Sequence, residues 1–370
     1  MPLQLETYKA NRDAELIKLC ARAVQASSPV TFNSIGYPER IIDNSQIVWF
    51  ADAMHEDEGQ PEAVFSDDFY VTDEEAELVN EVADIVEALT EKQFGIRVRP
   101  WASLLFCLNM FRLVKAMSNF AGEDLPVYEI GPGSGYLGAL LVRSGHRYVA
   151  TDIAEGFYLW QSRMLEAMAE GDFCELAEER VNGTIVDPGT RVVHVPWWIH
   201  GSYYRTKCPF NASLVVCDHA FGEMSNFGLK YTIAASKDIL VGSGTRALLT
   251  TSIGFPHINK LNEVITQFYR GGFVPLIAQG PLVFVPEKSD LGAMGVRLED
   301  LKEEIRSPGS KREIDQQLLK IGDDPNYYFK DKGHKLTAAK SVFPINWEHA
   351  PLDYPFIEYI GDPVPSTSDS

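Results

Sequence analysis

The chain has 370 residues, of which 45% are hydrophobic and 23% are charged, proportions typical of an ordinary globular protein with additions around a core domain. Its 52 acidic residues against 33 basic ones give a formal net charge of −19. Because contacts with phosphate groups need a basic face, this charge argues against nucleic acids and anionic membranes as partners.

The sequence also argues against secreted and membrane-spanning classes. The N-terminal residues lack the basic-then-apolar pattern of a signal peptide, and no stretch approaches the roughly 18 uninterrupted apolar residues of a membrane span. The five cysteines are scattered without a C-x-x-C pair, which fits free thiols better than a disulfide framework or a zinc site. We therefore expect a cytoplasmic protein.

Residues 1–120 are expected to form a mainly helical region. Helical spacing of apolar residues covers 15–24, and Asp73 is placed to cap a second helix with acids on its outer face. A third helix over about 101–120 is apolar nearly all round, which predicts burial against the sheet that follows. Residues 51–90 hold 14 acids and no Lys or Arg, a run that we interpret as a solvated face.

Residues 121–290 alternate strand and helix signals, which predicts a Rossmann-like α/β domain with a mostly parallel sheet and helices on both faces. We expect strands at 127–130, 147–153, 191–195, 214–217, 247–252 and 282–285, and helices at 136–142, 157–170, 231–240 and 260–270. Residues 291–370 are expected to form a C-terminal extension that ends in a frayed tail.

A glycine loop follows the first predicted strand, in the segment E-I-G-P-G-S-G that contains Glu129, Gly131, Gly133 and Gly135. A strand, a glycine turn and a helix N-terminus make a pocket in which backbone N–H groups face a ligand. The carboxylate of Glu129 would repel a pyrophosphate. It suits a cationic ligand that carries an amino acid, such as S-adenosylmethionine (SAM).

A dinucleotide site is the rival interpretation, because Gly133, Gly135 and Gly138 form a G-x-G-x-x-G string. In that register the strand would have to run through Pro132, which has no N–H for an inner strand to donate. Starting the string one glycine earlier puts Tyr136 in the third glycine position. Neither register fits the dinucleotide fingerprint.

The second and third predicted strands supply two further candidate cofactor-binding residues. Asp152 ends the second strand, where an acid accepts hydrogen bonds from ribose hydroxyls, and it fits a SAM site and an NAD site equally. Trp197 follows the third strand and could stack on adenine, although paired tryptophans are at least as often core packing.

Three ionisable residues follow the fourth predicted strand, namely Asp218, His219 and Glu223. A hydroxyl acceptor needs a base to take its proton, and His219 suits that role. If a helix starts here, Glu223 shares its face and could orient the imidazole. Asp218 and Glu223 could instead hold Mg²⁺, but the fifth strand shows no paired acid and His257 is a weaker ligand for a hard cation. We expect no metal.

The segments E-x-G-P-G-S-G and D-H-A-F-G-E-M (residues 218–224), with the acid that ends the second strand, resemble the class I SAM-dependent methyltransferases. More narrowly they resemble the sugar O-methyltransferase family, whose members carry a similar Asn or Asp, His and Glu-Met segment after the fourth strand. The resemblance covers about residues 100–290, and the family's third-strand acid has no counterpart at 196–198.

The resemblance implies transfer of a methyl group from SAM to a hydroxyl of a small-molecule acceptor, in the first place a sugar or glycosylated metabolite. Two alternatives stay open: an NAD-dependent oxidoreductase, and a non-catalytic SAM-fold partner subunit. The oligomeric state, including a homo-oligomer, also stays open.

Overall fold

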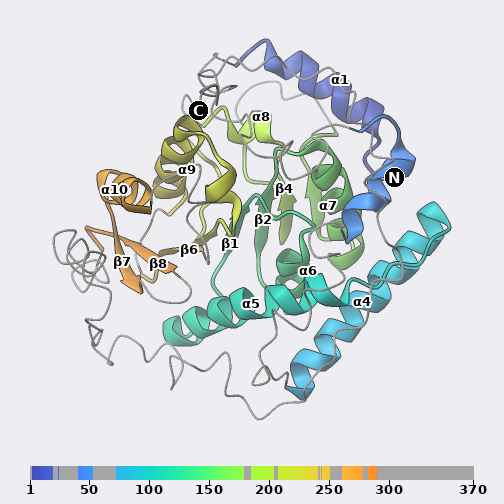
Figure 1. Ribbon diagram of the computed structural model, residues 1–370, viewed down its shortest axis with the longest axis horizontal. Helices are drawn as coiled ribbons and strands as arrows, with labels where there is room; N and C mark the ends of the chain where they lie inside the picture. The colour runs from blue at the N-terminus through green and yellow to red at the C-terminus, as the bar shows by residue number, and fades with distance from the viewer. Residues whose placement is uncertain are drawn as a thin grey trace, which may run out of the picture.

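The computed structural model describes residues 2–19, 24, 41–52, 72–178, 185–203, 207–240, 242, 244–250, 261–277 and 282–289. The predictions for residues 291–370, for most of 51–71 and for His257 therefore lie outside the described residues. One mixed sheet forms the centre of the molecule (Figure 1).

The sheet has the strand order β3-β4-β2-β1-β5-β6-β8-β7. Its strands are β1 (Val127–Ile130), β2 (Tyr148–Thr151), β3 (Phe173–Glu175), β4 (Val192–His194), β5 (Leu214–Val216), β6 (Ala247–Thr250), β7 (Phe273–Ile277) and β8 (Leu282–Pro286). The pairs from β3 to β6 are all parallel, whereas β8 runs antiparallel to both β6 and β7. From β1 the chain passes to β2, then to the edge strand β3 and back to β4, before it crosses to β5 on the other side of β1 and continues to β6. This reversal puts a ligand site at the carboxyl ends of β1 and β5.

Helices cover both faces of the sheet. The helices that follow the sheet strands are α6 (Tyr136–Arg143), α7 (Glu155–Met168), α8 (Trp197–His200), the 3-10 helix η2 (Ala220–Glu223), α9 (Asn226–Ile239) and α10 (Leu261–Arg270). Right-handed crossovers that move in opposite directions from β1 place their helices on opposite faces. Figure 1 shows α6 and α7 on one side of the strands and α9 and α10 on the other. The predicted fold class, a Rossmann-like α/β sheet with helices on both faces, is confirmed.

The described residues before β1 form helices. They are α1 (Leu5–Leu16), η1 (Asn44–Ala51), α4 (Asp73–Phe94) and α5 (Trp101–Ala121). Thr72, and not Asp73, is the N-cap of α4, because its hydroxyl accepts from the Glu75 N–H while the Glu75 carboxylate accepts from the Thr72 N–H. Three acids in the first turn add favourable charge at the helix N-terminus.

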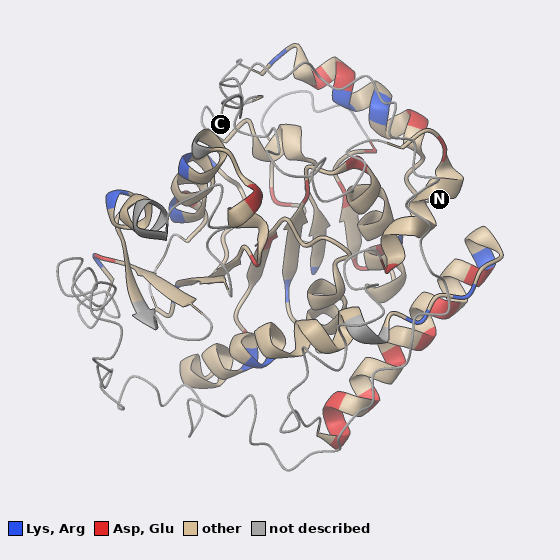
Figure 2. Cartoon of the chain, viewed as in Figure 1, with Lys and Arg blue, Asp and Glu red and all other residues tan. Residues whose placement is uncertain are grey.

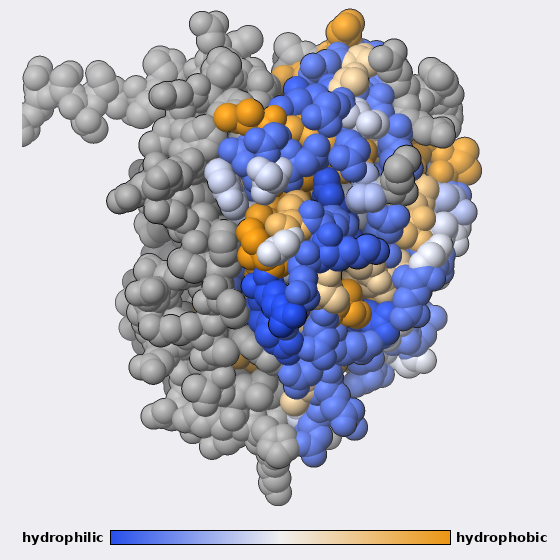
Figure 3. Space-filling model, turned by 90° about the vertical axis from the view of Figure 1, so that its right-hand side faces the viewer, coloured by the Kyte–Doolittle hydropathy of each residue, from blue (hydrophilic) through white to orange (hydrophobic). Residues whose placement is uncertain are grey.

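The acids of α4 spread along the helix (Figure 2). On that side of the molecule the described surface is mostly hydrophilic with small separate apolar patches (Figure 3). The inner face is apolar, and Val82 of α4 and Leu108 of α5 belong to the same buried cluster as Leu140 of α6. The predicted burial of the 101–120 helix is therefore confirmed, and the core extends from the sheet into the N-terminal helices.

Helix α1 ends at Leu16, and residues 20–23 of the helix predicted over 15–24 lie outside the described residues. Two strands differ from the sequence predictions. Strand β3 was not predicted because it is only three residues long and lies at the sheet edge. Strand β7 was not predicted because it contains Pro275, which is tolerated here beside a register irregularity at the other edge.

Candidate functional site

The sheet register brings the predicted site residues to one edge. Ile130 of β1 pairs with Thr151 of β2, so Gly131 and Asp152 leave the sheet side by side. Glu129 pairs with Val216 of β5, and Asp218 follows two residues later. The glycine loop, the acid after β2 and the acidic segment after β5 therefore meet where parallel strands end.

The three loop glycines all have positive φ angles, of 72° at Gly131, 58° at Gly133 and 80° at Gly135. Side chains rarely adopt this left-handed conformation. A Cβ at Gly131 would lie 2.8 Å from the Cβ of Ala220 in η2, and one at Gly135 would lie 2.9 Å from Cε of Met164 in α7. The loop thus requires glycine both for its conformation and for close approach to η2 and α7.

Gly138 has a different function from the loop glycines. A Cβ there would lie 2.4 Å from the ring of Tyr148, so its small size lets α6 pack on β2. The Tyr148 hydroxyl then reaches the carboxylate of Glu129 and donates a hydrogen bond to it. The third glycine of the G-x-G-x-x-G string is explained by this packing. Strand β1 ends at Ile130, before Pro132, as the rejection of the dinucleotide register requires.

Glu129 is only 3% exposed. Burial raises the pKa of its carboxyl to about 8, an effect that the Tyr148 hydrogen bond opposes and the charges of Asp218 and Asp152 reinforce. The site therefore holds a carboxyl that loses its proton readily only when a cation comes near.

Asp152 lies against the glycine loop. One carboxylate oxygen accepts from the Ala154 N–H at 2.9 Å, and the other accepts from the Gly133 N–H at 3.2 Å and from Gln161 Nε2 at 2.8 Å. Burial raises the pKa of Asp152 to about 6, although these hydrogen bonds act in the opposite direction. A ribose hydroxyl that reached this carboxylate would meet an acceptor whose orientation is already fixed.

The three candidate catalytic residues after β5 differ in their exposure to solvent. His219 is exposed and has a φ of 57°, which is unusual for a residue with a side chain. The α-helical spacing predicted for His219 and Glu223 is absent, because the four-residue η2 is a 3-10 helix that repeats every three residues. Burial, followed by the charge of Asp152, raises the pKa of the Glu223 carboxyl to about 7. Asp218 is half-buried at the start of the segment.

Metal binding finds no support among the described residues, in which no three His, Cys, Asp or Glu side chains are grouped so as to hold an ion. Residues 251–260, which include the end of the predicted fifth strand and His257, are outside the described part.

Trp197 begins α8, directly after β4, and is 8% exposed. Its ring contacts Trp198 edge to face, and Trp198 in turn contacts Tyr8 of α1 in the same way. The two indoles are thus part of an aromatic cluster between α8 and α1, and the adenine contact expected of Trp197 stays a prediction.

Two residues that touch the loop were missed from the sequence. Tyr148 falls within the predicted strand 147–153 and Gln161 within the predicted helix 157–170, and neither was predicted as a site residue. Gln161 is fully buried in α7 and donates to the carbonyl oxygen of Gly133 at 2.5 Å. The available signal was its polarity on the face that also carries Met164, three residues on.

No protein-family model and no curated protein matches the chain. Among solved structures, it is similar to a TehB-like SAM-dependent methyltransferase from Corynebacterium glutamicum, with 13% identity and a TM-score of 0.33 over 47% of this chain and 87% of that one. It is similar to a Nostoc punctiforme protein named as an O-methyltransferase, with 11% identity and a TM-score of 0.28 over 56% and 67% of the two chains. PigF with SAH gives 13% identity and a TM-score of 0.29 over 57% and 69%. TM-scores and identities this low do not indicate a shared activity. The activity has to be inferred from the chemistry of the chain's own residues.

Proposed function

We propose that this chain is a SAM-dependent methyltransferase that methylates a hydroxyl of a small polar molecule. The observation that carries the proposal is a half-buried glycine loop edged by carboxyl groups whose pKa values are raised to about 8 at Glu129, 7 at Glu223 and 6 at Asp152. Burial raises all three pKa values, and neighbouring carboxylates raise those of Glu129 and Glu223 further. Hydrogen bonds from Tyr148, Gln161 and backbone N–H groups, together with the charge of His194, act in the opposite direction. Such a site favours a ligand with positive charge.

SAM carries that charge on its sulfonium and its ammonium groups, whereas a nicotinamide dinucleotide brings a pyrophosphate. A pyrophosphate at the loop would face the carboxyl of Glu129, only two residues before Gly131. A cation near that carboxyl would lower its raised pKa and pair with the carboxylate that forms, whereas a pyrophosphate would raise the pKa further and gain no such pairing. This supports SAM over NAD. Of the candidate residues, Glu129 fits the ammonium group and Asp152 fits the ribose hydroxyls.

The acceptor side is proposed from the segment after β5. When SAM is bound, its sulfonium supplies a methyl carbon that is open to attack. As the acceptor oxygen bonds to that carbon and the carbon–sulfur bond breaks, His219 would take the hydroxyl proton, since its exposed side chain is accessible to an acceptor. A sugar or glycosylated metabolite is the acceptor class that we place first, on the resemblance of the D-H-A-F-G-E-M segment.

The test is isothermal titration calorimetry of the full chain with S-adenosylhomocysteine (SAH) and with NAD in parallel. We expect saturable SAH binding and no heat from NAD. NAD binding without SAH binding would establish the oxidoreductase alternative. Incubation with methyl-labelled SAM and fractionated metabolite extracts then separates an enzyme from a non-catalytic partner subunit, because only the enzyme transfers label to a small molecule.

None of the helices in the described ranges has the length and apolar composition needed to cross a bilayer. The working proposal for the turnover experiment is a small acceptor in a cytoplasmic setting, which the scattered cysteines of the sequence favour. We would look for the transferred methyl label first in the polar fraction of the extract.

A further inference from the structure

A chain of buried polar side chains leads from Asp152 to the edge of the sheet. Gln161 Nε2 lies 2.8 Å from Asp152 Oδ2 and 2.5 Å from the Gly133 carbonyl oxygen. Gln161 Oε1 lies 3.2 Å from His194 Nε2, and His194 Nδ1 lies 2.7 Å from Glu175 Oε2. Gln161 and His194 are fully buried, and the Glu175 side chain is 2% exposed.

Donor and acceptor chemistry fixes the hydrogens in this chain. One end of the Gln161 amide lies beside the Gly133 carbonyl oxygen and the Asp152 carboxylate. Both of these neighbours accept hydrogen bonds, so the amide atom at that end must be the nitrogen. The amide oxygen therefore faces His194, whose Nε2 must carry a hydrogen. On its other side, His194 Nδ1 faces Glu175. The other Glu175 oxygen, Oε1, already accepts from the Tyr158 hydroxyl and from the Ala177 N–H.

These contacts can all be made only if His194 and Glu175 hold one proton more than a neutral imidazole and a carboxylate do. The proton lies either on His194 Nδ1 or on Glu175 Oε2, and in both arrangements it bridges the pair. An unpaired polar group at this depth would be costly, so the fold favours the arrangement in which each of these contacts contains a hydrogen.

We propose that Gln161, His194 and Glu175 are positioning residues that hold the Asp152 carboxylate and the Gly133 backbone in place for the ribose of a nucleoside ligand. The proposal rests on the proposed function, since it takes SAM as that ligand. It assigns a purpose to β3, the edge strand that the sequence did not predict, because β3 brings Glu175 into register with His194.

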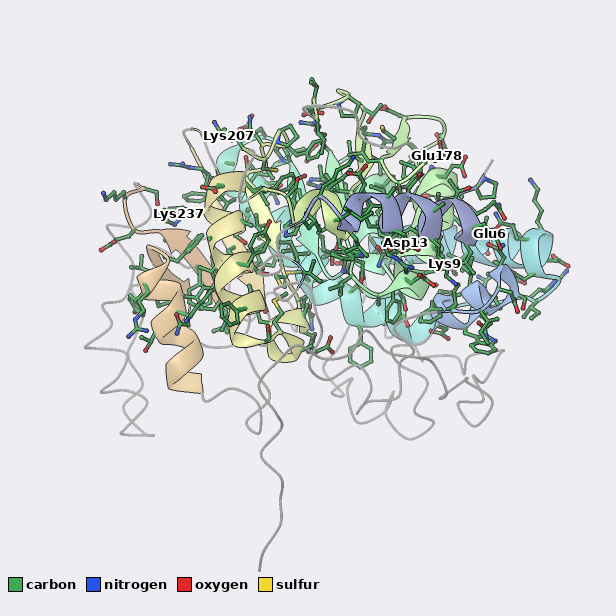
Figure 4. All side chains as sticks on the ribbon, turned by 90° about the horizontal axis from the view of Figure 1, so that it is seen from above. Glu6, Lys9, Asp13, Glu178, Lys207 and Lys237 are labelled. Atoms are coloured by element: carbon green, nitrogen blue, oxygen red, sulfur yellow. The ribbon has the colours of Figure 1, made fainter. Side chains whose placement is uncertain are left out.

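The N-terminal region contacts this network of side chains in two places, at the turn that follows Glu175 and at the start of α7, the helix that carries Gln161. On α1, Asn11 Nδ2 donates to the carbonyl oxygens of Ala177 and Glu178, in the turn that follows Glu175. Figure 4 shows Glu178 beside α1, on which Lys9 and Asp13 are labelled. At the start of α7, Glu155 accepts from Arg12 Nη1 at 2.6 Å and from the Ile41 N–H at 3.1 Å. The helix that carries Gln161 and the turn after Glu175 are thus tied to the same segment.

The positioning depends on the partner that Glu175 gives to His194 Nδ1. If that partner is lost, the single hydrogen of a neutral imidazole can move to Nδ1, and the lone pair of Nε2 then faces the oxygen of Gln161. Two acceptors would oppose each other and the contact with Gln161 would break.

The decisive variant is Glu175→Gln. Its amide nitrogen would donate to His194 Nδ1, its oxygen would keep the bonds from Tyr158 and Ala177, and a neutral imidazole would keep its hydrogen on Nε2. We expect SAH affinity at pH 7 within about threefold of wild type, whereas Glu175→Met, which offers His194 Nδ1 no partner, should weaken it. Gln161→Met should also weaken SAH binding, by about 10–100-fold, the range found when a supporting partner of a ligand-holding group is removed.

Calorimetric dissociation constants for SAH at pH 7 test the proposal, with Ser162→Ala as the control at the next buried position of α7. Wild-type affinity in Gln161→Met would overturn the positioning role, and so would equal dissociation constants for Glu175→Gln and Glu175→Met. If Gln161→Met does not fold, the comparison of the two Glu175 variants decides. Failure of the wild type to bind SAH would overturn the proposed function instead.

Discussion

The hydroxyl of Tyr148 on β2 donates a hydrogen bond to the buried carboxylate of Glu129 on β1, on the face of the sheet that α6 covers. This bond opposes, without cancelling, the effect of burial on the Glu129 pKa. The ligand-free protein therefore keeps an ionisable group in an unfavourable place. That is expected of a residue that serves a ligand and not the stability of the fold.

The first prediction concerns Glu129→Gln. In the folded chain the pKa is about 8, above the ordinary value of a glutamate, so the stability that this carboxyl contributes is present at low pH and is lost as pH rises through about 8. Each pKa unit is worth about 1.4 kcal/mol. Without ligand at pH 8, Glu129→Gln should raise the free energy of unfolding by on the order of 2–4 kcal/mol, because its amide keeps the Tyr148 hydrogen bond without a charge.

Urea denaturation of both proteins at pH 5 and pH 8 measures this difference. The gain should be much smaller at pH 5, and SAH affinity should fall in the same variant. An equal gain at both pH values would mean that Glu129 is ionised throughout and that burial does not control its charge.

The second prediction concerns Gly133→Val. A β-branched residue at a φ of 58° is strained and would block close approach of a ligand to the loop. We expect loss of SAH binding with a folded protein, measured by calorimetry and circular dichroism. Gly145→Val is the matched control, because Gly145 also has a positive φ, of 90°, but lies in the turn before β2 with open space around it. Retained SAH affinity in Gly133→Val would remove the loop from the binding site.

The third prediction concerns Asp152→Ala. Loss of hydrogen bonds from the ribose hydroxyls should weaken SAH binding by about 1.5–3 kcal/mol. Asp187→Ala is the control, since Asp187 Oδ1 accepts from the N–H two residues on at 2.9 Å, as Asp152 Oδ1 does. Asp187 pairs with Arg147, at the opposite end of β2. Equal dissociation constants for the two variants would place the ribose elsewhere.

The fourth prediction concerns His219, once an acceptor has been found. His219→Asn lacks a base but tolerates the left-handed backbone conformation of this position. It should lower kcat by roughly 10²–10⁴-fold and leave the SAH dissociation constant unchanged, because the imidazole would face the acceptor. EDTA should not affect the wild-type rate. A rate that falls with EDTA and returns with Mg²⁺ would assign the activation of the hydroxyl to a metal held by Asp218 and Glu223.

The strands and the glycine loop were predictable from the sequence because their signals are local. Buried parallel strands such as β1 and β5 appear as short apolar runs, and the loop glycines and Asp152 follow them directly. The contacts of Gln161, His194 and Glu175 join α7, β4 and β3, and they depend on a sheet register that no local pattern specifies. The positive φ of His219 has no local signal either, because histidine carries no strong preference for it.

The packing of α6 at Gly138 affects the ionisation of Glu129. A single methyl group at this position would displace the ring of Tyr148, which it would approach within 2.4 Å, and would take the hydroxyl away from Glu129. The pKa of Glu129 would then rise further, so more of the protein would carry a neutral carboxyl at the loop. A substitution that changes only the volume of a buried helix surface would thereby act as a change of charge in the binding site, and a screen for charge variants alone would overlook it.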